Sequence, residues 1–228
     1  MSAVGARRVP RLRALALLLA TGLTLTVLAG CGGGPEPAAT VRDGDDDGLH
    51  GAVLVDQYVV PDLSLTDTAG KPFNLVTDTD KPLTLVFFGY TNCPDLCPLT
   101  MANVASAMAR LTDEQRSEVD VVVITTDPAR DDPATLRAWL DRFNPDFIGL
   151  TGPLSEITKI ADDMGVYIQK GKKLPSGGYE VDHGTPLVAV DAHDRSPVVW
   201  TQGFSPADLA DDVSAMLAHP DEFGQAKG

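Results

Sequence analysis

Apolar runs alternate with amphipathic segments along the chain after residue 49. The runs LTLVFFG at 83–89 and VDVVVIT at 119–125 are almost continuously apolar, which is typical of central strands covered on both faces. Apolar residues at helical spacing follow over residues 97–111, and a second amphipathic segment at 206–217 closes the chain. These segments predict an α/β protein in which helices cover a buried sheet.

Helix boundary signals predict two more helices. Asp132 is a good N-cap and Pro133 suits the first helical position, so together they open a helix that runs to Phe143. A third helix is predicted over residues 154–164, and Gly165 marks its end.

Short strands complete the pattern. Strands are predicted at 166–169, 179–181 and 187–190, with a hairpin turn at Gly177 and Gly178. Strand, helix, strand, helix, then a hairpin and a last helix imply a layered α/β fold with a mixed sheet.

Two of the three cysteines lie directly after the first apolar run, in the stretch NCPDLCP. A cysteine pair where a central strand ends and a helix opens is the thioredoxin arrangement. The segment from Tyr58 to Leu75, with a turn at Ala69-Gly70, is predicted to be an added hairpin. We therefore predict an α/β, thioredoxin-like fold with a central mixed β-sheet flanked by helices and an N-terminal β-hairpin extension.

The first thirty residues predict an export signal. They carry four arginines and no acidic residue, followed by an apolar stretch over 14–29. The stretch ends in LAGC, which resembles a bacterial lipobox whose cysteine, Cys31, is lipidated and becomes the new N-terminus. The alternatives are a cleaved signal with a chance cysteine and a retained membrane helix, for which the stretch is short. We predict a lipoprotein signal peptide at 1–30 and a domain on the extracytoplasmic face of the cell membrane.

Composition separates a linker from the domain. Residues 31–48 are rich in Gly, Pro and Asp and lack apolar periodicity, which predicts a lipid-anchored, flexible acidic linker. Residues 49–228 form the predicted thioredoxin-like domain. Without the four signal arginines, 14 basic residues face 32 acidic ones, a net charge near −18, so nucleic acid is excluded as a partner.

Cys93 and Cys97 are separated by three residues, where redox motifs usually place two. If Cys31 carries lipid, Cys93 and Cys97 are the only free thiols of the chain. They lie in a compartment where thiols tend to be oxidised, so we expect them to form a disulfide, a metal site, or each in turn. A purely structural disulfide is the alternative, although such bridges usually link distant segments. Cys97 falls near the predicted helix start, where unpaired amides favour an anion, so we expect a lowered pKa for its thiol.

A nearby histidine would decide the chemistry, because thiolates select Cu(I), zinc or iron–sulfur clusters and imidazole suits copper and zinc. Among four histidines, His183 follows the strand YEV in the loop VDHGTP, which leads into a buried strand. In a thioredoxin-like fold that loop faces the cysteine motif across the end of the sheet. From the residues alone, His183 is either a metal ligand or a solvated loop residue.

Four stretches, GYTNCPDLCPLTM, ITTDPARDDPATLRAWLDRFNPDFIGLTG, MGVYIQK and YEVDHG, resemble the Sco (SenC) family of copper proteins in order and spacing. The resemblance covers about residues 55–217. Members of this family are membrane-anchored thioredoxin-like domains. The resemblance implies one copper ion, as Cu(I) or Cu(II), held by Cys93, Cys97 and His183.

The resemblance also singles out residues around these ligands. Asp127 and Arg130 match the family motif DPxRD, and Asp182 precedes the histidine in VDH, so the three are expected to support the site. A turn with an ion pair explains the first two equally well. Two departures stand out: Thr185-Pro186 is either a displaced counterpart of the thioredoxin cis-proline or an ordinary trans bond, and Leu99 replaces a small polar residue on the expected partner surface.

The resemblance implies a copper metallochaperone that delivers copper to the binuclear site of cytochrome c oxidase subunit II, or to another extracytoplasmic copper protein. Metal loading would depend on an extracytoplasmic thiol reductant. The alternative is an enzyme, a thiol-disulfide oxidoreductase that keeps the recipient's cysteines reduced, with Cys93 and Cys97 as its redox-active catalytic pair. The CxxxC spacing favours metal binding, since oxidoreductases of this fold normally use CxxC. A copper buffer with no recipient is a third interpretation.

Overall fold

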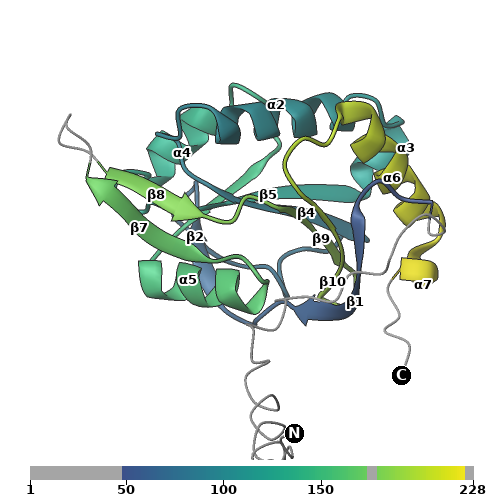
Figure 1. Cartoon of the computed structure of the whole chain (residues 1–228), viewed down its shortest axis with the longest axis horizontal. Coiled ribbons are helices and arrows are strands. Elements are labelled where there is room, and N and C mark those ends of the chain that lie inside the picture. The colour runs from purple at the N-terminus through teal and green to yellow at the C-terminus, as the bar shows by residue number, and fades with distance from the viewer. Residues whose placement is uncertain (1–47, 174–178, 224–228) are drawn as a thin grey trace, which may run out of the picture. The chain divides into compact units, whose positions relative to one another are not determined.

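Figure 1 shows the computed structural model, which describes residues 48–173 and 179–223. The predicted signal peptide, the lipidated Cys31 and nearly all of the predicted linker lie outside the described residues, as does the turn predicted at Gly177 and Gly178. Within the two described ranges, no helix is long and apolar enough to cross a membrane.

Eight strands form one mixed sheet in the order β1-β10-β9-β4-β5-β6-β2-β3. β4 (Leu83–Gly89), β5 (Val119–Thr125) and β6 (Ile148–Thr151) run parallel, and β9 (Leu187–Asp191) pairs antiparallel with β4. Every residue of β4 is buried, which confirms the prediction of a central strand. The strands nearer the two edges are β1 (Ala52–Val59), β10 (Arg195–Trp200), β2 (Ser64–Asp67) and β3 (Pro72–Asn74).

Helices cover both faces of this sheet. α2 (Leu96–Met108) and α4 (Pro133–Leu140) lie over one face, and α5 (Leu154–Asp163) lies under the other (Figure 1). The predicted α/β, thioredoxin-like fold with a central mixed sheet is therefore confirmed. The other helices are α3 (Asp113–Ser117), α6 (Pro206–Ala218) and α7 (Pro220–Phe223).

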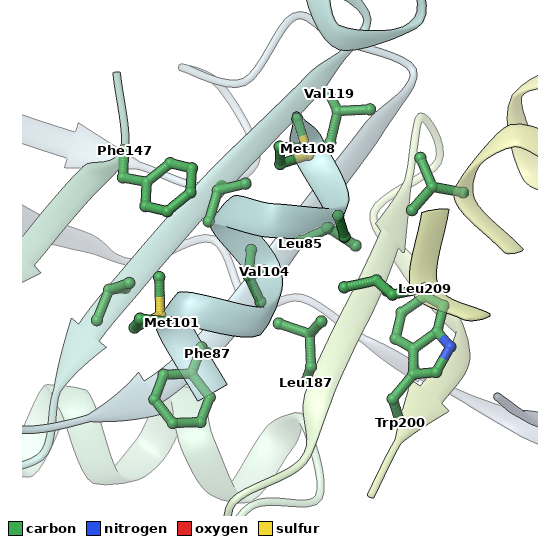
Figure 2. Packing of buried hydrophobic residues seen from close by; sticks show 14 of the residues in the cluster. Leu85, Phe87, Met101, Val104, Met108, Val119, Phe147, Leu187, Trp200 and Leu209 are labelled. Carbon is green, nitrogen blue, oxygen red and sulfur yellow. The ribbon is translucent and has the colours of Figure 1, made fainter. Parts of the chain in front are cut away.

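Two hydrophobic cores hold the strand that leads to the cysteines. Figure 2 shows α2 packing through Met101 and Val104 on the face of β4 that carries Phe87. Since successive side chains of a strand point to opposite faces, Phe88 joins the other core, where it packs with Ile157 of α5. Both phenylalanines are fully buried, so β4 is fixed from both sides.

The Asp132 cap is present as predicted. The Asp132 carboxylate accepts a hydrogen bond from the backbone amide of Thr135 at 2.7 Å, and α4 begins at Pro133. The helix ends at Leu140, three residues before the predicted end at Phe143.

The end of α5 explains a shift in the following strand. Gly165 takes a φ of +71°, a left-handed conformation that suits glycine, and the Val166 amide donates to the Ala161 carbonyl at 2.7 Å. These bonds close the helix, so Val166 does not begin the strand. The strand predicted from Val166 instead starts two residues later, as β7 (Ile168–Lys173).

The N-terminal hairpin is shorter than predicted. It consists of β2 and β3, with the turn at Gly70 (φ +78°), and it extends the sheet beside β6. Tyr58 was expected in this hairpin, and that prediction is wrong. It lies in β1, which pairs with β10 near the opposite edge and has an irregular register between Val53 and Tyr58. This irregularity hides the alternation that would have identified β1.

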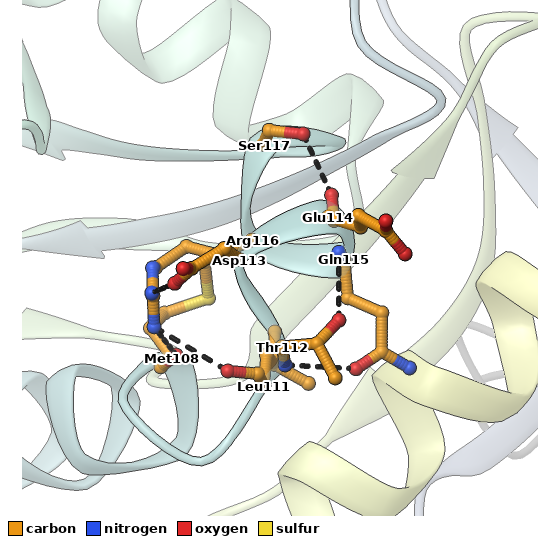
Figure 3. Close-up of polar contacts among 8 residues, drawn as sticks. All are labelled: Met108, Leu111, Thr112, Asp113, Glu114, Gln115, Arg116 and Ser117. Carbon is orange, nitrogen blue, oxygen red and sulfur yellow. Dashed lines mark hydrogen bonds and ion pairs between the residues drawn. The ribbon is translucent and has the colours of Figure 1, made fainter.

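α3 was not predicted, because its five residues include no buried one and so carry no apolar periodicity. Local hydrogen bonds hold it (Figure 3). The Gln115 amide donates to the Thr112 hydroxyl at 3.2 Å and the Thr112 amide donates to the Gln115 side chain at 3.0 Å, a capping box. Arg116 donates to the carbonyls of Met108 and Leu111, which ties α3 to the end of α2.

A buried carboxylate holds the first described residues against the domain. Asp212 of α6 accepts hydrogen bonds from the amides of His50 and Gly51, each at 2.9 Å, and from the Trp200 indole at 2.6 Å. A Cβ at Gly51 would lie 2.6 Å from the same indole nitrogen, so only glycine fits there. These contacts attach residues 50 and 51 to α6 and β10.

β7 and β8 (Tyr179–His183) form a separate two-stranded antiparallel ribbon, which Figure 1 shows in green beside α5. Its base is tied by the Gly184 amide, which donates to the Tyr167 carbonyl at 2.9 Å. Val181 packs against the core beneath α2. The ribbon thus carries the predicted ligand His183 toward the end of the sheet where the cysteines lie.

Candidate metal centre

The two cysteines differ in depth. Cys93 lies in the turn after β4, where its amide donates to the Tyr90 carbonyl at 3.2 Å, and it is half-buried. Cys97 lies in the first turn of α2 and is fully buried. Both are present as thiols.

Hydrogen bonds at the start of α2 converge on the Cys93 sulfur. The Cys97 thiol and, at 3.3 Å, the Cys97 amide both donate to it, and the amides of Asp95 and Leu96 add to the effect. Together they outweigh burial and lower the pKa of Cys93 from 9.0 to about 6.

The predicted lowered pKa of Cys97 is wrong. Because its thiol donates to Cys93 and is itself deeply buried, the pKa of Cys97 is raised. The helix start does favour an anion, but its amide hydrogens point at the preceding cysteine.

Gly89 provides the space for the Cys97 sulfur. A Cβ at this last residue of β4 would lie 3.2 Å from Cys97 Sγ and 2.5 Å from Cε1 of Phe87. Neither neighbour can move freely, since both are fully buried. The absence of a side chain here lets the buried thiol lie directly over the strand end.

His183 is the last residue of β8 rather than a loop residue, and only 9% of its surface is exposed. Its Nδ1 lies 2.7 Å from the Gly184 carbonyl, and donation to that oxygen puts the ring's lone pair on Nε2. The Tyr90 ring meets the imidazole edge-on, with centroids 5.8 Å apart and an interplanar angle of 77°. The imidazole is therefore oriented, in a tautomer whose Nε2 could bind a metal ion.

One cavity of about 570 Å³ joins the two sides of the site. Among the residues that the structure describes, no three His, Cys, Asp or Glu side chains lie close enough to hold a metal ion as they stand. The cavity does bring the Cys93 and His183 side chains to a shared space, with Cys97 behind Cys93 in the core. Its other lining residues include Tyr90, Pro94, Asp95, Leu96, Tyr167 and Gln202.

The predicted supporting pair lies next to Tyr90. Arg130 forms an ion pair with the buried Asp127, and its guanidinium carbon stands 5.8 Å from the Tyr90 ring centroid. Burial, together with the charge of Cys93, raises the pKa of Tyr90. The third supporting residue, Asp182, pairs in the ribbon with Gln169, and its side chain lies outside what the structure describes.

Asp131, the last residue of the DPxRD motif, was missed by the sequence analysis. It is fully buried, and its carboxylate accepts hydrogen bonds from Thr91 and Thr125. The sequence did carry a signal for it, because Asp131 lies in the loop that follows the central strand β5, and such loops lie at the edge of a parallel sheet where ligands bind. Its charge also contributes to the raised pKa of Cys97.

The two departures from the family pattern have different outcomes. The Thr185–Pro186 bond is trans, so the ordinary interpretation holds, and the Gln202 amide donates to the Thr185 hydroxyl. Leu99 is 59% exposed on α2, one turn after the partly exposed Leu96 of the cavity wall. Its place on a partner surface stays a prediction.

The SCO1/SenC family model matches residues 54–218. Protein sco1 of Schizosaccharomyces pombe is 34% identical over 151 residues, which cover 64% of this chain and 56% of that protein. The solution structures of apo Sco1 from Thermus thermophilus match with a TM-score of 0.67 and 30% identity, over 76% of this chain and 99% of that one. Arabidopsis thaliana ScoI with copper bound matches with a TM-score of 0.64 and 26% identity, over 71% of this chain and 99% of that one. The chain belongs to the SCO1/SenC family.

Proposed function

We propose that the domain binds one copper ion through Cys93, Cys97 and His183 and passes it to a second protein. The observation that carries the proposal is the shared cavity of Cys93 and His183, with the Cys97 thiol directly behind Cys93. Thiolate sulfur and imidazole nitrogen together suit copper. Family membership and the copper in the solved ScoI structure favour copper over zinc.

The protonation of the three groups suggests how the ion is taken up. Cys93 is a thiolate at neutral pH and meets the cation first. Cys97 releases its proton on binding, so loading is coupled to proton release. His183 then joins by closure of the ribbon over the cavity. In this order, the two cysteines bind the ion first and His183 completes the site.

Three protein ligands leave a coordination position at which a partner ligand can enter, so the ion leaves by ligand exchange. We propose the binuclear copper site of cytochrome c oxidase subunit II, or another extracytoplasmic copper protein, as the recipient. Because the same thiols can close to a disulfide, loading needs an extracytoplasmic thiol reductant.

Copper titration of the reduced protein tests the proposal. We expect a 1:1 complex with strong Cys-to-Cu(II) charge-transfer absorption, lost in Cys93→Ser and Cys97→Ser. His183→Ala should weaken binding by about 100-fold or more, given that outer partners of metal ligands alone are worth roughly 10–100-fold. His193→Ala, in an exposed turn, is the matched control and should bind as the parent does. Full affinity in His183→Ala would refute the ligand set.

The unequal thiols support a second candidate, a thiol-disulfide reductase. In this reaction the Cys93 thiolate attacks a partner disulfide and forms a mixed disulfide, and one partner thiolate leaves. Cys97 then loses its proton and attacks Cys93, which releases the reduced partner and leaves a Cys93–Cys97 disulfide. Cys97→Ser should trap the mixed disulfide. Brisk turnover by His183→Ala, together with unchanged copper affinity, would favour the reductase.

We infer from the sequence that Cys31 carries lipid and holds the domain at the extracytoplasmic face of the membrane. Substitution Cys31→Ser should move the protein from the membrane fraction to the soluble extracytoplasmic fraction. Labelling with a fatty-acid analogue should mark the parent and fail on the variant. Equal labelling of the parent and of Cys31→Ser would refute the lipidation of Cys31.

A further inference from the structure

One buried residue, Asp131, links the ends of the three parallel strands. Asp131 Oδ2 accepts hydrogen bonds from the Thr91 amide at 2.9 Å and from the Thr125 hydroxyl at 2.6 Å. Its Oδ1 accepts from the Thr91 hydroxyl at 2.6 Å, and its backbone carbonyl accepts from the Thr151 hydroxyl at 3.0 Å. Asp131 therefore joins the segment after β4, the end of β5 and the end of β6.

Thr91 connects this carboxylate to the turn that carries Cys93. It stands two residues before Cys93, and both its amide and its hydroxyl donate to Asp131. The amide of Cys93 in turn donates to the Tyr90 carbonyl and closes the turn. Loss of the acceptor would leave a partly buried amide unsatisfied, a cost that favours a different turn conformation.

Little else in the sheet fixes this turn. The paired register of β4 and β5 ends at Gly89 and Thr125, and one further bond, from the Thr126 amide to the Gly89 carbonyl at 2.8 Å, follows it. Beyond that bond, Cys93 is held by the Asp131 contacts to Thr91, by its own amide bond to the Tyr90 carbonyl, by the bond from the Cys97 amide to its sulfur, and by packing on the core.

We propose that Asp131 is a positioning residue which, through Thr91, holds the Cys93 sulfur where it can share an ion with Cys97 and His183. The last part of this statement rests on the proposed copper function. The first part, that Asp131 fixes the Cys93 turn, does not. The hydrogen bonds that Asp131 accepts come from Thr91, Thr125 and Thr151, so its effect on Cys93 is transmitted by the backbone of residues 91–93.

The test compares Asp131→Ala and Asp131→Asn with Asp132→Ala, a control in the same turn whose exposed side chain caps α4. Two quantities are measured on the full chain. The first is amide hydrogen exchange of the reduced, metal-free protein at Thr91 and Cys93, referred to Val122 in β5. The second is Cu(II) affinity together with the charge-transfer spectrum.

For Asp131→Ala we expect exchange at Thr91 and Cys93 to rise at least tenfold while Val122 is unchanged, with copper affinity at least tenfold weaker and a shifted charge-transfer band. Asp131→Asn should fall between parent and Asp131→Ala, because its amide oxygen can still accept from the Thr91 amide. Asp132→Ala should match the parent in both readouts.

Three results would overturn the proposal. One is parent-like exchange at Thr91 and Cys93 in Asp131→Ala or, should that variant not fold, in Asp131→Asn. Another is an equal rise at Val122, which would make the role of Asp131 one of general stability. The third is an unchanged copper spectrum in a protein whose turn exchange has risen. A parent that binds no copper while the exchange result holds would refute the copper function and leave the fixing of the turn intact.

Discussion

The cysteine side and the histidine side of the candidate site are built differently. Cys93 and Cys97 follow a strand that two hydrophobic cores enclose, and Asp131 holds their turn from within. His183 lies on a ribbon that forms its own two-stranded sheet. The cysteine side thus draws on the stability of the whole domain, whereas the histidine side is held by contacts around Tyr90 and Gly184 and by the packing of Val181 against the core.

This difference indicates that the cysteine side is the more rigid part of the candidate site and the histidine side the more mobile one. A region with few buried apolar contacts opens at a lower free energy than a region in the core. Under the proposed copper function, the two sulfurs would be held in place before the ion arrives, and the imidazole would be the group that moves. Release of the ion would begin on the same side.

The largest expected effect is on the cysteine side. Phe87→Ala removes a fully buried ring beneath α2 and should lower the free energy of unfolding by about 3–5 kcal/mol. Urea unfolding followed by circular dichroism measures this. The control Val59→Ala changes an exposed residue of β1 and should stay within about 0.5 kcal/mol of the parent. A small loss in Phe87→Ala would contradict the idea that the core supports the cysteines.

A methyl group at Gly89 should act on the same side more locally. Gly89→Ala places a carbon 3.2 Å from Cys97 Sγ and 2.5 Å from the Phe87 ring, and such overpacking costs roughly 1–3 kcal/mol. Copper affinity should fall with it, because Cys97 must shift. Gly184→Ala, directly after β8, is the matched control: its new carbon would come no closer than 3.4 Å to its neighbours, so the free energy of unfolding should be nearly unchanged.

Alkylation by iodoacetamide should follow the thiolate of Cys93. With a folded pKa of about 6, the thiolate is fully present well above pH 6 and is lost as the pH falls through that value. The rate at pH 5 should therefore be roughly a tenth of its plateau, one unit below the pKa. Cys97→Ala removes the first hydrogen bond to Cys93 and should move the midpoint upward. A parent midpoint near 9 would contradict the hydrogen-bond geometry.

The smallest expected effect is on the histidine side. Tyr90→Phe removes the hydroxyl that accepts a backbone hydrogen bond from Val181, and keeps the ring edge against His183. The cost should be about 0.5–1.5 kcal/mol, typical of one hydrogen bond. Amide exchange should quicken at Val181 and stay unchanged at Leu85 in β4. Equal changes at both positions would show that the ribbon and the core open together.

The central elements were predictable because their signals are local. Continuous burial of β4 gives a run of apolar residues, and Asp132 before Pro133 marks a helix start. β1 and β10 lacked such a signal, since the first has an irregular register and the second contains the proline of RSPVVW. Their places depend on pairing with partners far along the chain.

The sequence singled out the residues of the candidate site, but it could not predict their electrostatics. Spacing identified the cysteines and motif resemblance identified His183, but neither could say which sulfur receives the amide hydrogens of α2. Asp131 was missed for the same reason. Only the parallel order of β4, β5 and β6 brings Thr91 and Thr125 to the carboxylate of one residue and Thr151 to its backbone carbonyl.

The hydrogen bonds of Asp212 limit how far the domain can lie from its proposed lipid anchor. Asp212 binds the amides of His50 and Gly51, so with Cys31 as the lipidated residue only the 18 residues between Cys31 and His50 separate the membrane from the domain. Fully extended, that many residues span at most about 65 Å. Under the proposed lipid anchor, this length limits how far His50 can lie from the bilayer, and a longer or shorter segment would hold the proposed copper site at a different height for its recipients.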